Sequence, residues 1–227
     1  MKFARRRAQR LRILISAGPT REPLDRVRFV SNYSTGYMGA LLASEARARG
    51  HRVLVVHGPL VEPLPRGTKR LAVEQAHEMD AAMRRKARLA DVVVMAAAVS
   101  DFRVAHVARG KWPRRGRHTL VLEATPDIIG RLPRRARQLV VGFAVESARV
   151  VPRAKRKLRE KRLDLLIAQH ANGSGAPFGR HRVRAWLLER GGTVHPMGKV
   201  AKRTVARTLL DKIETLWYGQ PERVLRT

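Results

Sequence analysis

The pattern LRILISAGP at residues 11–19 recurs as HRVLVVHGP at residues 51–59. Each stretch is a short apolar run that ends at a Gly-Pro pair, which is typical of a buried strand followed by a turn. Between them, residues 38–49 place small and apolar side chains on one helical face, and Gly50 follows as a stop signal. The sequence therefore predicts a strand, a helix and a second strand, with an unusually long first loop at residues 20–37. Loops of this kind inside compact domains are usually functional.

The alternation of strand and helix patterns continues along the chain. Further strands or extended segments are predicted at residues 69–73, 91–99, 118–123, 139–144, 163–168 and 183–188, helices at 77–89, 147–161 and 199–217, and flap-like loops at 100–117 and 170–182. This order predicts a single α/β domain over residues 11–217, a doubly wound, mostly parallel, Rossmann-like sheet with helices on both faces. Residues 1–10 are expected to be a basic extension and residues 218–227 a frayed tail.

Composition limits the classes of protein to which the chain can belong. Its 227 residues are 44% hydrophobic and 29% charged, which is typical of a folded globular protein. The absence of cysteine excludes disulfides, thiolate nucleophiles, iron–sulfur clusters and Cys-ligated zinc. The longest apolar run, residues 92–99, is far shorter than the roughly 20 residues that cross a bilayer. We therefore expect a cytoplasmic protein without a membrane span.

In a doubly wound sheet, ligands bind beyond the carboxyl ends of the strands, so the loops after Ala17, Val99, Glu123 and Ala144 are candidate sites. The helix start STGYMG at residues 34–39 could hold a phosphate on its backbone N–H groups, or its glycines could serve tight packing. A P-loop, a dinucleotide fingerprint, a nucleophile elbow and an H-E-x-x-H pair are all absent. A site without an obvious nucleophile or base suits chemistry by positioning and charge neutralisation, such as nucleotidyl transfer.

Several stretches, taken together and in order, resemble one enzyme family. They are GPTREPLDRVRFVSNYSTGYMG at 18–39, VMAAAVSDFR at 94–103, a lysine-containing loop at Lys111, TPDII at 125–129, VGFAVES at 141–147 and KLREKRLDLLIA at 157–168. Across about residues 11–215 the chain resembles phosphopantothenate–cysteine ligase, the coenzyme A biosynthesis enzyme also called phosphopantothenoylcysteine synthetase. It is most similar to a stand-alone ligase domain of the bacterial type.

The resemblance implies a reaction that joins the carboxylate of 4′-phosphopantothenate to the amine of cysteine. CTP would first convert the carboxylate into an acyl-cytidylate with loss of pyrophosphate, and the amine would then displace CMP. Bacterial members use CTP and eukaryotic members mostly ATP, and the motifs here resemble the bacterial type. The resemblance also implies Mg²⁺, no flavin, and a homodimer whose active site is completed across a two-fold interface.

The resemblance further implies roles for individual residues in catalysis and substrate binding. Asn32 matches an asparagine that contacts the acyl group, where its carboxamide could donate to an oxygen that gains charge. Lys111 matches the first lysine of a mobile loop that closes over the phosphates, and within that motif only Arg114 preserves a second charge. These two are the candidate catalytic residues. Arg28 and Gly36, with Asn32, are the candidate substrate-binding residues, although Arg28 could also be an ordinary surface arginine.

A larger set matches the family's nucleotide site. Met95, Ala96 and Ala97 match a strand end along the nucleotide, and Asp101 matches an acidic residue that contacts ribose or metal. Lys111 matches a lysine at the phosphates, and Pro126, Asp127, Ile128 and Ile129 match a helix start. Phe143, Lys157 and Lys161 complete the set. The spacing of Lys157 and Lys161 places them on one helix face, where they could reach a triphosphate or simply be solvated.

The runner-up function is a basic nucleic-acid-binding protein. The 48 Lys and Arg residues against 18 Asp and Glu give a formal net charge of +30, and arginine runs lie at residues 5–7, 84–86 and 134–137. With only three Trp, three Tyr and five Phe, stacking platforms for bases are not expected. The sequence therefore predicts nucleic-acid binding that is non-specific and salt-sensitive. A nicotinamide oxidoreductase is disfavoured by the missing dinucleotide fingerprint.

Overall fold

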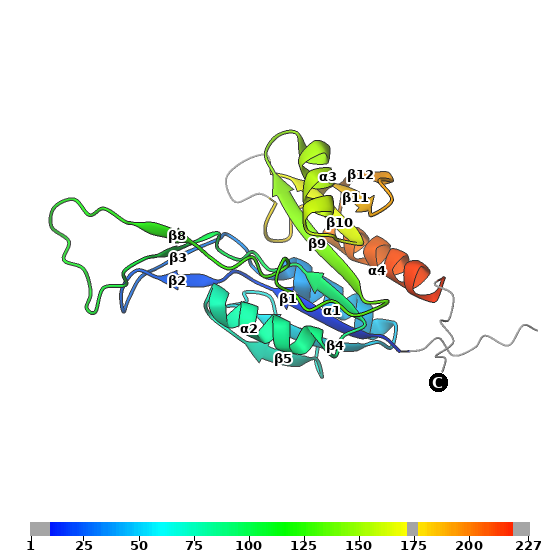
Figure 1. The fold of residues 1–227 in the computed structure, drawn as a ribbon, viewed down its shortest axis with the longest axis horizontal. Coiled ribbons are helices and arrows are strands. Elements are labelled where there is room, and N and C mark those ends of the chain that lie inside the picture. Colours follow the sequence, from blue (N-terminus) through cyan, green and yellow to red (C-terminus); the bar gives the residue numbers. More distant parts are fainter. Residues whose placement is uncertain (1–9, 172–176, 220–227) are drawn as a thin grey trace, which may run out of the picture.

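The computed structural model describes residues 10–171 and 177–219 and confirms the predicted α/β class. The strands of its central sheet are β1 (Arg12–Ala17), β4 (Arg52–His57), β5 (Lys69–Ala72), β6 (Val92–Met95), β9 (Leu139–Glu146), β10 (Leu165–His170), β11 (Val183–Glu189) and β12 (Val194–Val200). They lie in the order β12-β11-β10-β9-β6-β1-β4-β5 (Figure 1). The strands from β10 to β5 are parallel, and β11 and β12 add an antiparallel edge.

Helices cover both faces of this sheet, as a doubly wound fold requires. Helices α1 (Tyr37–Ala48) and α4 (Lys202–Tyr218) pack on one face, and α2 (Ala76–Ala87) and α3 (Val150–Glu160) on the other. Because side chains alternate along a strand, Ile13 and Ile15 of β1 enter the first core while Leu14 enters the second. Burial on both faces explains why the strands form nearly continuous apolar runs.

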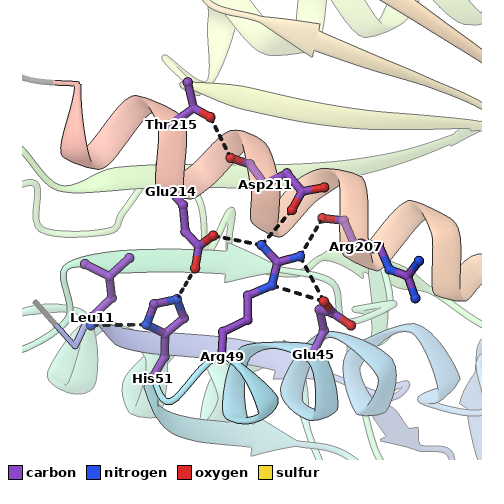
Figure 2. Close-up of polar contacts among 8 residues, drawn as sticks. All are labelled: Leu11, Glu45, Arg49, His51, Arg207, Asp211, Glu214 and Thr215. Atoms are coloured by element: carbon purple, nitrogen blue, oxygen red, sulfur yellow. Dashed lines mark hydrogen bonds and ion pairs between the residues drawn. The ribbon is translucent and has the colours of Figure 1, made fainter. Parts of the chain in front are cut away.

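A charged cluster joins the end of α1 to α4 (Figure 2). The guanidinium of Arg49, just after α1, forms ion pairs with Glu45 at 2.8 Å, Asp211 at 2.7 Å and Glu214 at 2.8 Å. The buried His51 ring contacts Glu214 at 2.9 Å. This cluster fixes α4 against α1 on the first face of the sheet.

Two hairpins project from the sheet as an arm, which we define as residues 21–31 and 102–124. Strand β2 (Arg21–Pro23) pairs with β3 (Phe29–Ser31), and β7 (Phe102–Val104) pairs with β8 (Leu122–Ala124), both antiparallel. The hairpins lie side by side (Figure 1), and the Ala108 N–H donates to the Leu24 carbonyl at 3.0 Å. The predicted long first loop is thus partly folded into a hairpin.

Several predicted elements differ from the observed ones. The strand predicted at 91–99 ends at Met95. Of the strand predicted at 118–123, only Leu122 and Glu123 lie in a strand, β8, which belongs to the arm and not to the sheet. The helix predicted from residue 199 begins at Lys202, because β12 occupies residues 194–200. No helix begins at residues 126–129, because residues 126–127 are irregular and residues 128–131 form a single turn.

At the carboxyl end of the described chain, α4 extends to Tyr218. Residues 1–9 and 220–227, and part of the predicted flap at 170–182, lie outside the described residues. Within residues 10–171 and 177–219, no helix is long and apolar enough to cross a membrane.

Candidate functional site

A cavity of 590 Å³ opens at the carboxyl ends of the parallel strands. It lies at the switch point between β1 and β6, from which later strands are added to the sheet in opposite directions. This is the expected ligand position in a doubly wound sheet. Its walls come from the loop before α1, the loop after β6, the 125–129 turn, the end of β9, helix α3, residues 177–179 and the first residue of α4. The cavity therefore touches both helical layers of the domain.

Most residues predicted for the site line this cavity together. They are Asn32, Met95, Ala96, Ala97, Asp101, Pro126, Asp127, Ile128, Ile129, Phe143, Lys157 and Lys161. The loop after β6 is fixed by the Ser16 hydroxyl, which accepts a hydrogen bond from the Ala97 N–H at 3.1 Å. Three predicted residues, Arg28, Gly36 and Lys111, are not among those that line it.

Asn32 lies where the arm meets the sheet. Its Nδ2 donates to the carbonyl of Ala98 at 2.9 Å, which holds the side chain against the loop after β6. One further N–H and the carboxamide oxygen remain available for a ligand. Asn32 is therefore positioned to donate a hydrogen bond into the cavity.

The two glycines at the start of α1 differ in their surroundings. A Cβ at Gly39 would come within 2.3 Å of the Ala17 Cβ, so this glycine serves tight packing of α1 on β1. Gly36 precedes the helix with φ of 79°, and no side chain caps the helix. Tyr37 and Met38 of the first turn line the cavity, so the positive end of the helix dipole faces it.

Lys157 of α3 and Lys161, which follows the helix, both line the cavity. Lys157 donates from Nζ to the Phe143 carbonyl at 2.9 Å, and burial lowers its pKa. Lys161 forms an ion pair with Asp127 at 2.5 Å. Burial acts to raise the pKa of Asp127, but Lys161 and the Gly130 N–H lower it overall. Both cations are thus held in place, and a ligand phosphate would have to share or replace their present acceptors.

Arg28 and the Lys111 loop are brought together elsewhere, on the arm. The buried carboxylate of Asp25 accepts hydrogen bonds from the Val27, Arg28 and Trp112 N–H groups and pairs with the Arg28 guanidinium. Arg28 also donates to the Trp112 carbonyl at 3.1 Å. These contacts, the Arg28 ion pair above all, hold the pKa of Asp25 well below its usual range. Arg28 is thus tied to the residue that follows Lys111.

The family model of the DNA/pantothenate metabolism flavoprotein C-terminal domain matches residues 8–216. The chain belongs to this family. It is 36% identical to the Coenzyme A biosynthesis bifunctional protein CoaBC of Escherichia coli K12, a match that covers 94% of this chain and 54% of that protein. It is also 36% identical to a cysteine/cysteine sulfinic acid decarboxylase of an unknown prokaryote, over 90% of this chain and 58% of that protein.

Among solved structures, the crystal structure of the CoaBC C-terminal domain is 34% identical and superposes with a TM-score of 0.78, over 94% of this chain and 99% of that one. This likeness confirms the family resemblance and the fold inferred from the sequence. The chain spans about half the length of the curated relatives it matches.

Two residues were missed in the sequence: Asp25, which joins Arg28 to Trp112 on the arm, and Lys202, which lines the cavity. Asp25 carries a local signal, since an acidic residue three positions before Arg28 can pair with it across a turn. Lys202 carries none, because it lies among other basic residues near a predicted helix start. It lines the cavity although only 5% of it is exposed.

Proposed function

We propose that this domain is a ligase of coenzyme A biosynthesis that joins 4′-phosphopantothenate and cysteine with CTP, releasing CMP and pyrophosphate. The observation that carries the proposal is the convergence of Asn32, Lys157 and Lys161 on one cavity at the sheet's switch point. The cavity lining that the structure describes holds no histidine or cysteine. That suits a reaction in which the nucleotide, and not the protein, carries the activated acyl group.

In the first step, a carboxylate oxygen of phosphopantothenate attacks the α-phosphorus of CTP, and the bond to pyrophosphate breaks. Lys157 and Lys161 neutralise the charge that moves onto the leaving pyrophosphate. In the second step, the cysteine amine attacks the acyl carbon, and the bond to CMP breaks as the amine loses its proton. Asn32 donates to the acyl oxygen while it carries negative charge. Neither step requires a flavin.

A magnesium ion fits the donor set of this cavity only as a partner of the substrate phosphates. The Asp101 carboxylate makes no hydrogen bond or ion pair to another described residue, and it lines the cavity. Among the described residues no group of three His, Cys, Asp or Glu could hold a metal. Mg²⁺ is commonly bound by one or two carboxylates with substrate phosphates and water. Asp101 would hold it, and the ion would add positive charge at the phosphates.

We also propose a homodimer formed through the arm. Large apolar side chains are exposed along it, at Val27, Phe29, Val30, Phe102, Val107, Val121 and Leu122. An exposed apolar patch of this kind marks an interaction surface. Because Arg28 and Lys111 lie on the same arm outside the cavity, a second copy could receive them at its own site.

The cytoplasmic location stays a prediction.

The function is tested by following pyrophosphate release with phosphopantothenate and either CTP or ATP, before and after cysteine is added. We expect CTP to support release and cysteine to be required for the amide product, which mass spectrometry identifies. Cysteine alone should yield no CO₂, which separates this activity from that of the decarboxylase relative. Product formed without any nucleotide, or none formed with either, would refute the proposal.

A further inference from the structure

Lys202 is a buried cation that faces the cavity without an acidic partner. It is the first residue of α4, and its Nζ donates to the Gly179 carbonyl at 2.7 Å. None of the ion pairs among the described residues includes it, and burial lowers its pKa to about 8. An ammonium has three N–H donors, so two remain for groups in the cavity. Burying a charge without a partner is costly, which favours a ligand that supplies one.

The surroundings of Lys202 suit an anion. Helices α1 and α4 pack on the same face of the sheet, and the first turn of α1, at Tyr37 and Met38, lines the same cavity. The positive end of the α1 dipole and the Lys202 ammonium therefore act on one region. The acidic residues that line the cavity are Asp101 and Asp127, and Asp127 is already paired with Lys161. Lys157 and Lys161 enter from α3, on the opposite face of the sheet.

We propose that Lys202 is a substrate-binding residue that donates to phosphate oxygens at the start of α1. The inference rests on the proposed function, because phosphorylated substrates must occupy this cavity. The cavity then has two cationic walls, one at Lys202 and one at Lys157 and Lys161. The phosphate recognised at Lys202 belongs either to phosphopantothenate or to the nucleotide, and direct binding distinguishes the two.

Lys202 also touches the segment at residues 177–180, which could make its role only structural. Arg180 of this segment forms hydrogen bonds to Glu62 at 3.0 and 2.9 Å and lies 5.6 Å from the centre of the Tyr37 ring. Arg180 itself does not line the cavity. Arg180→Gln is therefore a matched control, since it releases the same segment and leaves the buried ammonium in place.

The experiment measures binding to the full chain by calorimetry for wild type, Lys202→Gln, Lys202→Met and Arg180→Gln. The ligands are phosphopantothenate against pantothenate, CTP against cytidine, and inorganic pyrophosphate. We expect both Lys202 variants to lose about 10- to 100-fold in affinity for a phosphorylated ligand, the range of a charge-assisted hydrogen bond. Their affinity for the matching unphosphorylated ligand should stay within about twofold of wild type. Arg180→Gln should keep its phosphate affinity.

The pattern of loss identifies the source of the phosphate. Loss confined to phosphopantothenate assigns Lys202 to the acyl substrate, and loss confined to CTP and pyrophosphate assigns it to the nucleotide. Unchanged phosphate affinity in both Lys202 variants would overturn the proposal. Equal loss for phosphorylated and unphosphorylated ligands, matched by Arg180→Gln, would also overturn it. If pyrophosphate binds through Lys202 while no amide is ever formed, the ligase assignment fails and the binding role stands.

Discussion

At the scale of single residues, Asn32 separates the two steps of the proposed reaction. Its Nδ2 is oriented by the Ala98 carbonyl, and Asn32→Asp keeps the shape while replacing donors with a negative charge. The second step should suffer most, because an oxyanion then develops beside that charge. Losing one such donor commonly lowers the rate by about 10² to 10³. We expect quenched mixtures to contain phosphopantothenoyl-cytidylate and little amide by mass spectrometry. Normal product formation would contradict the assignment.

Asp25 gives a prediction about acid stability at the same scale. The pKa of Asp25 in the folded protein lies well below the ordinary value of about 3.9 for an aspartate, chiefly because of the hydrogen bond from Arg28. In acid, the folded protein therefore binds fewer protons than the unfolded chain. The Asp25–Arg28 pair stabilises the folded state fully above the pKa of Asp25 in the unfolded chain. This stabilisation is lost as the pH falls through the lower pKa of the folded protein. Between about pH 5 and pH 2, the urea midpoint of wild type should fall more steeply than that of Asp25→Asn. Parallel slopes would show that the pair contributes nothing.

Elements with regular apolar patterns could be predicted from the sequence, whereas those set by tertiary context could not. Strands β1 and β4 and helix α1 were predicted because both faces of the strands are buried and the helix has one apolar face. Strand β12 was missed because Pro196 and Gly198 disfavour a strand, and an edge position tolerates them. The arm hairpins were missed because their exposed apolar residues bury little within the domain. The cavity residues that belong to the sequence motifs were predicted. Lys202 was not, because only its buried position in the folded protein distinguishes it from the many other lysines and arginines.

The α1–α4 cluster gives a prediction at the scale of elements. Replacing Arg49 by Met leaves the carboxylates of Glu45, Asp211 and Glu214 facing one another (Figure 2). Removing the central charge of this half-buried ion-pair cluster should cost about 1 to 3 kcal/mol in the free energy of unfolding. Arg207→Ala is the control, since only the backbone carbonyl of Arg207 takes part. Urea unfolding measures both, and equal midpoints would disprove a stabilising role for the cluster.

For the whole molecule, the net charge of +30 predicts how nucleic acid binds. Arg134, Arg135, Arg137, Arg162 and Arg190 surround a hollow of 400 Å³ near the start of β9, with Asp164 as its acidic residue. Contact with several phosphates should make affinity for any duplex fall by orders of magnitude between about 50 and 200 mM salt. Filter binding with two unrelated sequences checks this. Tight, sequence-selective binding at high salt would instead favour the nucleic-acid-binding alternative.

The shared-site dimer can be tested by complementation between two inactive variants. Lys111→Gln alters the arm and Asn32→Asp alters the cavity, and each alone should lose most turnover. If the arm of one copy serves the cavity of the other, a hybrid dimer contains one site with both native residues. Random two-fold pairing of equal amounts should then restore about a quarter of wild-type turnover. If each copy uses its own arm, neither site of a hybrid is intact and mixing restores nothing. Sedimentation of the mixture confirms that dimers formed, so a failure to recover activity would argue directly against a site shared through the arm.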